Sequence, residues 1–428
     1  MADVEKHHNS LWEYSASPQV ETPALAGDLD TDVLIIGGGY TGLSTALHLG
    51  ESGVRSIVLE AQEVGHGGSG RNAGLVNPGV WLLPNEVEEQ LGKQAGGRLN
   101  AALSNSPDLV FSIIDKYEID CEAKRNGMLQ AAHARSKVQW VKDRHSQMAS
   151  LGLPVELITG SDLQVMTGSK VYRHAAVFDP RAGTIQPMSY ARGLARAALG
   201  AGATIHQNCP VQSLTLTGNR WTAQTARGSV RAEQVIVATN AYTDHFLPQI
   251  RNATVPVFMF QAATGPLSDN IAGSISPRRN GLFDTRKTMI SSRIDDAGRY
   301  IVCSAGRMTG DGRSLRTNWA TRVRDRLFPQ LQGQEWKFWW SGQMGFTDNH
   351  LPRVFQPAPG LTVPIGYNGR GIGPGTVIGK TCADLVQGGS IKDFPLPLKQ
   401  VRVESWRNVR AAYYELGTRL YNMVDSRV

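Results

Sequence analysis

Three glycines near the N-terminus have the spacing of a phosphate-binding turn. Gly37, Gly39 and Gly42 follow directly after the apolar run 32–36, which is typical of a strand buried on both faces. The first glycine of such a turn allows the tight bend, the second lets the backbone approach a pyrophosphate, and the third lets the next helix pack on the strand. N–H groups at the helix start then face the diphosphate. The pattern predicts a dinucleotide site.

An acidic residue closes the same unit. The helical pattern 43–52 leads to a second apolar run, 56–59, which ends at Glu60. A carboxylate there accepts hydrogen bonds from the ribose hydroxyls of an unphosphorylated adenosine and repels a 2′-phosphate. A glycine pattern alone would be weak evidence, but strand, turn, helix, second strand and acid occur here in register. These elements leave both NAD and FAD open.

A polar, glycine-rich loop, residues 61–74, comes directly after Glu60. It is too rich in turn residues for a strand or helix, so we expect it to present backbone N–H groups and the side chains of Ser69, Arg71 and Asn72 to a ligand. An NAD-binding unit has no need for this extension, whereas FAD continues through a ribityl chain to the isoalloxazine ring. An ordinary surface loop is the alternative. The position of the loop favours FAD.

Two later segments fit the same cofactor. The apolar strand pattern 232–241 follows alternating patterns at 211–216 and 221–225, which predict antiparallel strands. Near the C-terminus a second glycine-rich turn, 364–375, opens the helical pattern 376–386. We expect the positive end of that helix to face the pyrimidine edge of a flavin and to stabilise the reduced anion.

With these motifs the chain resembles the D-amino-acid oxidase/glycine oxidase superfamily, nearest the gamma-glutamylputrescine oxidase and bacterial L-pipecolate oxidase type. The motifs span nearly the whole chain: VLIIGGGYTGLSTALHL, GHGGSGRNAG, VIVATNAY, FWWSGQMGFTDNHLPRV, GYNGRGIGPGTVIGK and the closing AAYY. The resemblance implies an α/β fold, α+β overall, in which a Rossmann-like FAD-binding domain is interleaved with a mixed, largely antiparallel β-sheet substrate domain. We expect 1–82, 183–248 and 336–428 in the FAD-binding domain, and 83–182 and 249–335 in the substrate domain.

The resemblance also implies how FAD is attached and which residues contact it. Relatives that attach FAD covalently use a His in the stretch equivalent to 67–74 or a Cys in that equivalent to 340–347, and neither is present here, so noncovalent FAD is implied. Together the motifs and the resemblance assign these residues to FAD: Gly37, Gly39, Tyr40, Thr41, Gly42, Glu60, Ala61, Gln62, Gly68, Ser69, Gly70, Arg71, Asn72, Ala73, Gly74, Val211, Ala238, Thr239, Asn240, Gly342, Gly369, Arg370, Gly371 and Ile372.

The activity implied is oxidation of a C–N bond, with hydride passing from the carbon beside a neutral amine to flavin N5 and hydrolysis of the resulting imine. Such chemistry needs an aimed C–H bond and a dry site more than a catalytic base. The leading substrate is a cyclic secondary amino acid such as L-pipecolate, and a gamma-glutamylputrescine-type amine is the alternative. A flavin-carrying electron-relay subunit of a larger complex is a rival from another class. The electron acceptor, O2 or a quinone of a respiratory chain, stays open.

For anchoring a substrate anion, Arg370 is the first choice, because a guanidinium binds a carboxylate with two parallel hydrogen bonds. The alternative is an arginine bonded to backbone or to the flavin. Sarcosine oxidases, which the turn also resembles, have His where Arg370 stands and Lys where Gly373 stands, so a sarcosine-like pose is not implied. Arg293 and Lys287 lie on or beside strand patterns at 281–286 and 289–293 that we expect to roof the flavin; surface positions are the alternative.

Other polar and aromatic residues have plainer interpretations. His350 and Arg353 are expected in a solvated loop, with the cavity as the alternative, and Trp339 and Trp340 are expected in the core. The four cysteines form no metal-type cluster, so no metal site is expected and a cytoplasmic protein with reduced thiols is favoured. The net charge of +7 is spread along the chain, which argues against nucleic-acid binding.

The C-terminal segment 406–423 carries apolar residues at alternating spacings of three and four, which predicts an amphipathic helix. Docking of its apolar face onto its own domain is favoured. A peripheral membrane contact or a subunit contact is the alternative, and the former would suit an enzyme that feeds a respiratory chain. No apolar run reaches the length of about 20 residues that spans a bilayer.

Overall fold

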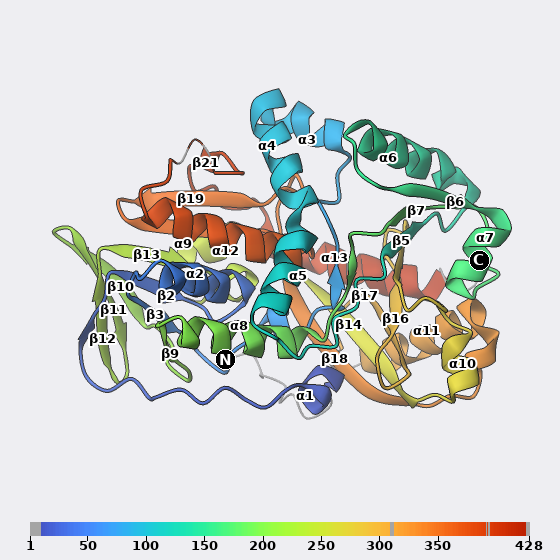
Figure 1. Cartoon of the computed structure of the whole chain (residues 1–428), viewed down its shortest axis with the longest axis horizontal. Coiled ribbons are helices and arrows are strands. Elements are labelled where there is room, and N and C mark those ends of the chain that lie inside the picture. The colour runs from blue at the N-terminus through green and yellow to red at the C-terminus, as the bar shows by residue number, and fades with distance from the viewer. Residues whose placement is uncertain (1–9, 309–311, 391, 393, 425–428) are drawn as a thin grey trace.

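The computed structural model describes residues 10–308, 312–390, 392 and 394–424. Two large β-sheets lie side by side in the molecule, each with its own helical cover (Figure 1). The mixed α/β architecture expected from the sequence is confirmed. Helices connect the two sheets at several points, so the segments of each half are not contiguous in the chain.

The first sheet has seven strands in the order β21–β19–β20–β13–β2–β3–β9. From β20 to β9 all neighbours are parallel. The central strands are nearly continuous apolar runs because both faces of the sheet are covered. The bounds are β2 (Val33–Ile36), β3 (Ser56–Leu59), β9 (Thr204–His206), β13 (Gln234–Val237), β19 (Arg353–Ala358), β20 (Leu361–Ile365) and β21 (Leu398–Lys399).

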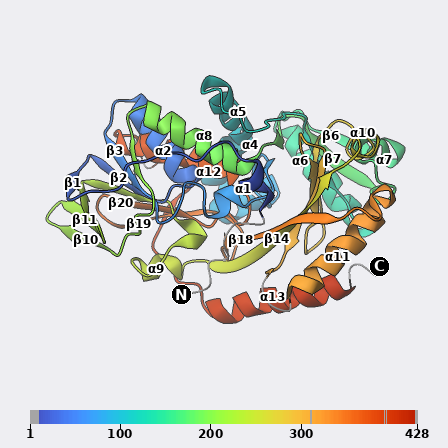
Figure 2. The ribbon, with the colours of Figure 1, turned by 90° about the horizontal axis from the view of Figure 1, so that it is seen from below.

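Helices cover one face of this sheet, and a small four-stranded sheet, antiparallel except for the β1–β12 pair, covers the other (Figure 2). Side chains of β2 alternate between the two cores: Val33 and Ile35 pack under the helices, Leu34 and Ile36 against the small sheet. The helices are α2 (Tyr40–Glu51), α5 (Ser106–Lys116), α8 (Pro187–Gly200) and α12 (Ile372–Val386). The small sheet consists of β1 (Leu29–Asp30), β12 (Gly228–Ala232), β11 (Arg220–Thr225) and β10 (Ser213–Thr217).

The second sheet has eight strands in the order β18–β14–β17–β16–β15–β5–β7–β6 and is antiparallel except for the β15–β5 pair. The expected antiparallel pairing of the 281–286 and 289–293 patterns is present as β15 with β16. Bounds are β5 (Met128–Ala131), β6 (Glu156–Thr159), β7 (Ala175–Asp179), β14 (Val255–Pro266), β15 (Gly281–Asp284), β16 (Ser291–Ile294), β17 (Arg299–Ala305) and β18 (Trp336–Phe346).

The remaining elements are helices around this second sheet and short connections. Strands β4 (Leu75–Val76) and β8 (Gly183–Thr184) form a two-stranded ribbon. The helices are α1 (Leu11–Ser15), α3 (Pro84–Leu91), α4 (Lys93–Ser104), α6 (Val138–Ser150), α7 (Gly160–Thr167), α9 (Pro248–Arg251), α10 (Asp269–Gly273), α11 (Gly312–Leu327) and α13 (Arg407–Val424). Short 3-10 turns are η1 (Gly68–Gly70), η2 (Arg135–Lys137), η3 (Asn240–Tyr242) and η4 (Pro329–Leu331).

The proposed domain division stays a prediction, although the strands largely follow it. Every strand of the seven-stranded sheet falls within 1–82, 183–248 or 336–428. Strand β18 is the exception in the last segment, because Trp336–Phe346 pairs with β14 in the other sheet. After β13 the chain therefore returns to the seven-stranded sheet only at β19, after residue 346.

The helical prediction for the C-terminal segment is confirmed, but the expected docking of its apolar face onto its own domain is wrong. The apolar residues of α13 are exposed, whereas Tyr414 and Thr418 face β14. Trp340 packs edge-on against Trp12 in the core as expected, and Trp339 is partly buried. No helix within the described residues is both long and apolar enough to cross a membrane.

Helices α2 and α12 approach each other closely at Gly379. A Cβ atom there would lie 2.5 Å from the Thr41 carbonyl oxygen and 2.7 Å from the Ser44 Cβ. Two hydroxyls join the helices: Thr45 Oγ1 donates to the Gly379 carbonyl at 3.0 Å and Ser44 Oγ to the Thr376 carbonyl at 2.7 Å. This contact fixes α12, and the turn before it, against the glycine turn that begins α2.

We predict that Gly379→Val lowers the stability of the holoprotein by about 1–3 kcal/mol, because the added methyl groups force the two helices apart. The measurement is the thermal unfolding midpoint, followed by circular dichroism. Gly200→Ala in α8 is the matched control, since a Cβ there meets open space. Equal midpoints for the two variants would contradict the close approach.

Candidate active site

A long cavity of about 350 Å³ lies where the parallel strands of the seven-stranded sheet end. Gly37 follows β2, Glu60 follows β3, Ala238 follows β13, and the turn 366–371 follows β20. Because these strands are parallel, their carboxyl ends share one edge of the sheet, the usual ligand position in such folds. Strand β14 of the second sheet closes the cavity with Met259.

Most residues assigned to FAD from the sequence line this cavity. They are Gly37, Gly39, Tyr40, Thr41, Glu60, Ala61, Gln62, Gly68, Ser69, Arg71, Asn72, Val211, Ala238, Thr239, Asn240, Gly342, Gly369 and Gly371. Ala73, Arg370 and Ile372 line an adjoining smaller cavity. Gly42, Gly70 and Gly74 line neither: Gly42 packs against the Gly37 carbonyl, Gly70 against Met188, and Gly74 against the Ile185 carbonyl.

The glycine turn has the shape required for a diphosphate. Gly37 has φ +112°, a conformation that L side chains rarely adopt. A Cβ on Gly39 would lie 2.8 Å from Ser69 Oγ, so a side chain there would fill the space between the turn and the loop. The amide of Tyr40 at the start of α2 points to the same place and donates to Ser69 Oγ at 3.1 Å. The residues therefore fit a bound pyrophosphate at the N-terminus of a helix.

Glu60 is held at the ribose end by two backbone amides. Gly38 N–H donates to Oε2 at 2.6 Å and Gln62 N–H donates to Oε1 at 2.9 Å. Burial raises the pKa of the Glu60 carboxyl above its ordinary value, and the two amides oppose that shift. Each carboxylate oxygen accepts one of these two amide hydrogen bonds. The remaining lone pairs of the ionised carboxylate are left to accept hydrogen bonds from ribose hydroxyls.

Asn72 organises the loop between the two cavities. Its Nδ2 donates to the Ser69 carbonyl at 2.7 Å and to the Tyr40 hydroxyl at 3.1 Å, and its Oδ1 accepts from Gly74 N–H at 2.8 Å. We expected this side chain to be presented to a ligand, but its amide is engaged within the protein. The Asn72 residue still borders both cavities.

Several cavity residues were missed in the sequence. They are His66, Gly67, Tyr242, Met259, Gln343, Met344 and Tyr367. All of these except Met259 stand within the quoted motifs and could have been included on that ground. Met259 could not, because its place depends on the alternation of β14: Phe260 packs in the core beneath α11, so Met259 points the other way.

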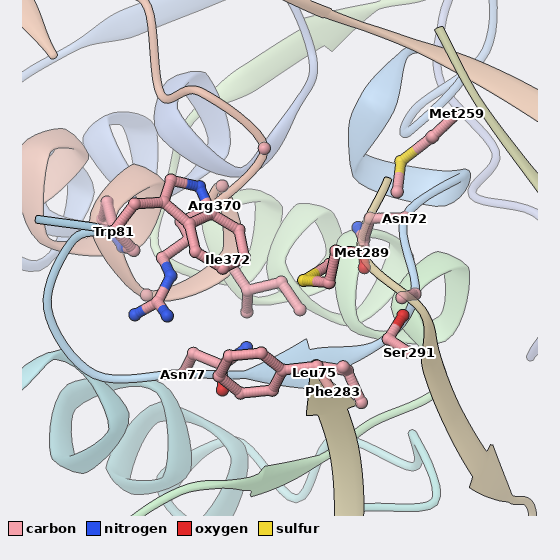
Figure 3. A pocket seen from close by; sticks show the side chains of 15 residues that line it. Asn72, Leu75, Asn77, Trp81, Met259, Phe283, Met289, Ser291, Arg370 and Ile372 are labelled. Atoms are coloured by element: carbon pink, nitrogen blue, oxygen red, sulfur yellow. The ribbon is translucent and has the colours of Figure 1, made fainter. Parts of the chain in front are cut away.

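The smaller cavity, of about 50 Å³, adjoins the first and shares Asn72, Met259, Gly369 and Gly371 with it. Figure 3 shows the side chains around it. Its wall is mainly apolar, and strands β15 and β16 contribute Phe283 and Ser291. The apolar members are Leu75, Trp81, Met259, Phe283, Met289 and Ile372.

Arg370 is the charged group of this cavity. Its side chain is buried, and its guanidinium lies 4.2 Å from the ring centre of Trp81 and 5.5 Å from that of Phe283. Nη1 donates to the Pro78 carbonyl at 2.7 Å, and the buried Nε has no partner. No described carboxylate forms an ion pair with Arg370. Burial, reinforced by the charge of Arg144, holds the pKa of Arg370 well below its ordinary value.

A second buried arginine fixes the segment to which Arg370 is bonded. Arg144 Nη1 donates to the Trp81 carbonyl at 3.1 Å, and Nη2 donates to the Val80 carbonyl at 3.2 Å. Burial lowers the pKa of Arg144 to about 10. Arg144 therefore positions the Pro78–Trp81 segment, and with it the aromatic ring that covers Arg370.

The other proposed substrate residues lie outside both cavities. Arg293 is buried beside Gly74 with its guanidinium 4.8 Å from the Trp12 ring centre, and Lys287 is exposed in the turn between β15 and β16. His350 packs edge-on against Phe346. Arg353 is buried in ion pairs with Asp348 and, at 3.0 Å, with Glu404, so its expected place in a solvated loop is wrong. Among the described residues no cluster of ligands could hold a metal ion.

A glycine turn at the start of a helix, a partly buried acid after the next strand and an adjoining apolar cavity with one cation are the arrangement expected of a flavin-dependent oxidoreductase. The sequence model of the family described as FAD dependent oxidoreductase (DAO) matches residues 32–385. The chain belongs to this family, and FAD is its cofactor.

Relatives of known sequence cover the chain almost from end to end. A protein named probable oxidoreductase OrdL from Haemophilus influenzae is 28% identical, with 98% of each chain covered. The gamma-glutamylputrescine oxidoreductase of Escherichia coli is 26% identical over 97% of this chain and 99% of its own. Solved structures share the fold: a Geobacillus kaustophilus glycine oxidase has a TM-score of 0.68 at 20% identity, covering 85% of this chain and 96% of its own.

Glu60→Gln is predicted to weaken FAD binding by about tenfold, because the new NH2 group must face either Gly38 N–H or Gln62 N–H, a donor against a donor. The dissociation constant is measured by flavin fluorescence as FAD is added to the apoprotein. Glu63→Gln is the control, since Glu63 is exposed in the same loop and its side chain accepts a hydrogen bond only from Gln19 among the described residues. Unchanged affinity in Glu60→Gln would remove Glu60 from the cofactor site.

Proposed function

We propose that the protein oxidises the C–N bond of a small α-amino or α-imino acid, with a cyclic secondary amino acid such as L-pipecolate as the leading substrate. The coarser statement, that it is an FAD-dependent oxidoreductase acting on amines or amino acids, follows from its family and relatives. In this proposal FAD is held noncovalently, and O2 or a quinone accepts the electrons.

One observation carries the proposal: a buried guanidinium, that of Arg370, lines the smaller cavity and has no acidic partner among the described residues. Arg370 lies between Gly369 and Gly371, which line both the FAD cavity and the smaller one. A carboxylate bound to Arg370 therefore lies close to the reacting centre. An α-amino acid has this geometry because its carboxylate and its amine share one carbon.

The size and lining of the smaller cavity narrow the substrate further. Leu75, Phe283 and Ile372 offer apolar contact to a compact aliphatic ring or side chain. A gamma-glutamyl amine, the alternative suggested by the name of the Escherichia coli relative, has its carboxylate many bonds from its terminal amine. With its carboxylate at Arg370, the reacting terminal amine of such a molecule would lie many bonds away rather than on the adjacent carbon, which favours the amino acid.

The protein contributes binding, orientation and exclusion of water. Bound FAD supplies the two-electron acceptor that takes a hydride from the carbon beside the amine. Arg370 holds the substrate carboxylate, and the aromatic and methionine side chains keep the cavity dry. Arg370 is the one ionisable side chain among the lining residues, so no carboxylate there stabilises an ammonium ion. The substrate amine is accordingly bound neutral, and the imine product is hydrolysed after oxidation.

The test is an anaerobic absorbance titration of the holoprotein at about 450 nm, where oxidised flavin absorbs. The panel contains L-pipecolate, L-proline, D-alanine, sarcosine and gamma-glutamylputrescine. Bleaching by the cyclic amino acids supports the proposal, and readmission of air separates an oxidase from a dehydrogenase. Bleaching by gamma-glutamylputrescine alone overturns it. A flavin that no amine reduces would favour the electron-relay subunit.

Arg370→Met is predicted to lower kcat/KM for the carboxylate substrate by about 30-fold or more, because a buried charge-assisted pair is lost. Flavin binding should stay intact. Arg125→Met is the control, since Arg125 also stacks on an aromatic ring, Phe111 at 5.3 Å, but at an exposed site. The measurement is kcat/KM of both variants from steady-state kinetics. Equal losses in the two variants would count against Arg370 as the anchor.

The lowered pKa of Arg370 predicts an alkaline limit to anion binding. A carboxylate ligand favours the charged guanidinium, so affinity is full below the lowered pKa and declines as the pH rises through it. The dissociation constant of a non-oxidisable carboxylate such as benzoate, followed by the flavin spectrum, should therefore rise at high pH. A constant affinity across the alkaline range, or a loss confined to acid pH, would contradict this origin.

A further inference from the structure

Helix α13 presents, on the surface of the protein, an apolar stripe that no other described residue covers. The helix lies along one edge of the molecule beside α11 (Figure 2). Its inner side, which includes Ala411, Tyr414 and Thr418, packs against β14. The outer stripe comprises Trp406, which directly precedes the helix, and Val409, Tyr413, Leu416, Leu420 and Met423. These six side chains are between 45% and 78% exposed.

The arginines of this segment are held by the protein itself. Arg407 Nε donates to the Thr254 carbonyl at 2.9 Å. Arg410 forms an ion pair with Glu404 at 2.6 Å, and Arg419 forms one with Glu415 at 3.0 Å. The stripe itself therefore carries no charged side chain, and the basic groups beside it are already paired. An anionic membrane surface would find few free cations here.

The spacing of the stripe indicates what covers it. Intervals of three, four, three, four and three residues repeat every 3.5 residues, the seam of a two-stranded coiled coil. A membrane-surface helix has a broader apolar face with the period of 3.6 residues. A narrow a/d seam instead fits another helix that bears the same repeat. A second copy of α13 has that repeat.

We propose that two copies of this protein associate through α13, packed antiparallel about a two-fold axis. The axis passes between Tyr413 and Leu416, so that each of these residues lies opposite the other in the partner copy. At each end of the seam, Trp406 of one copy then packs against Met423 of the other. The smaller, flexible methionine side chain accommodates the indole ring better than a second tryptophan would. Such an interface uses the same patch on both copies and closes as a dimer.

The positions beside the seam agree with the antiparallel arrangement. In this register Arg410 lies next to Gly417 of the second copy, and Arg419 lies next to Ala412. Each long side chain thus falls against a small one, and no two arginines meet. A parallel pairing would set Ala412 beside Gly417 and leave gaps on both sides of the seam. The antiparallel register fills the space and avoids repulsion between like charges.

The exposed area of the stripe is of the order that an interface needs. Two aromatic and four aliphatic side chains at these exposures offer at most on the order of 700 Å² per copy for burial, against roughly 800 Å² buried per partner in a standard protein interface. On an isolated monomer so large a continuous apolar patch would be unusual.

The oligomeric state of the holoprotein tests the proposal by sedimentation velocity at micromolar concentration. The wild-type protein should sediment as a dimer, and Leu416→Glu, which buries a charge at the centre of the seam, should sediment as a monomer. Val165→Glu is the control, because Val165 is 70% exposed on α7, away from the seam. Flavin absorbance and the thermal midpoint, expected unchanged, show that both variants fold. A monomeric wild type, or a dimeric Leu416→Glu, overturns the proposal.

Two further experiments test the antiparallel orientation of the helices and the alternative that a membrane covers the stripe. All four native cysteines are buried, so oxidative cross-linking reports on introduced ones. Tyr413→Cys protein mixed with Leu416→Cys protein should form a cross-linked dimer, whereas Trp406→Cys alone should not; cross-linking of Trp406→Cys would establish the parallel arrangement instead.

Flotation with phosphatidylserine-containing vesicles should leave wild-type protein at the bottom of the gradient. Co-flotation that Leu416→Glu abolishes would assign the stripe to a membrane and overturn the dimer.

Discussion

A buried guanidinium that has no acidic partner within the described part of the chain is the feature on which the proposed site depends. Removing a cation from water costs several kcal/mol, and a carboxylate or hydrogen bonds must offset that cost. Arg370 has one carbonyl, that of Pro78, and the face of Trp81. These contacts hold the group in place, but no described carboxylate serves as its counter-ion. In the proposed function an anionic substrate supplies the missing negative charge.

The fold makes this position possible by joining two sheets at one edge. Parallel strands deliver the glycine turn, Glu60 and the 366–371 turn to the same side, since their carboxyl ends coincide. The antiparallel sheet contributes Met259 from one strand and Phe283 from another. The contact of α2 with α12 at Gly379 then sets the distance between the phosphate-binding turn and the turn that carries Arg370. Cofactor and substrate residues are thereby fixed by one helix pair.

How much could be predicted from the sequence depended on how local each signal was. The turn, Glu60 and the loop lie within 38 residues, 37–74, and each has a spacing with a known physical task, so the fold class and FAD were predictable. Arg370 could be named from its glycine-rich turn, but the wall of the smaller cavity around it could not be predicted, because Trp81 and Phe283 meet Arg370 only through tertiary packing. Arg293 and Lys287 lie on or beside the expected strands, but strand position alone did not say that one is buried behind the loop and the other is exposed.

The most direct test compares a cyclic amino acid with its own carboxamide, which keeps the ring and the amine but removes the negative charge. The rate constant for anaerobic flavin reduction and the dissociation constant are measured for both by stopped-flow absorbance, at pH values that give equal fractions of neutral amine. If Arg370 anchors the substrate, the acid should bind at least about 30-fold more tightly than the amide. Equal affinity and equal rates for the two compounds would contradict the role assigned to the buried guanidinium.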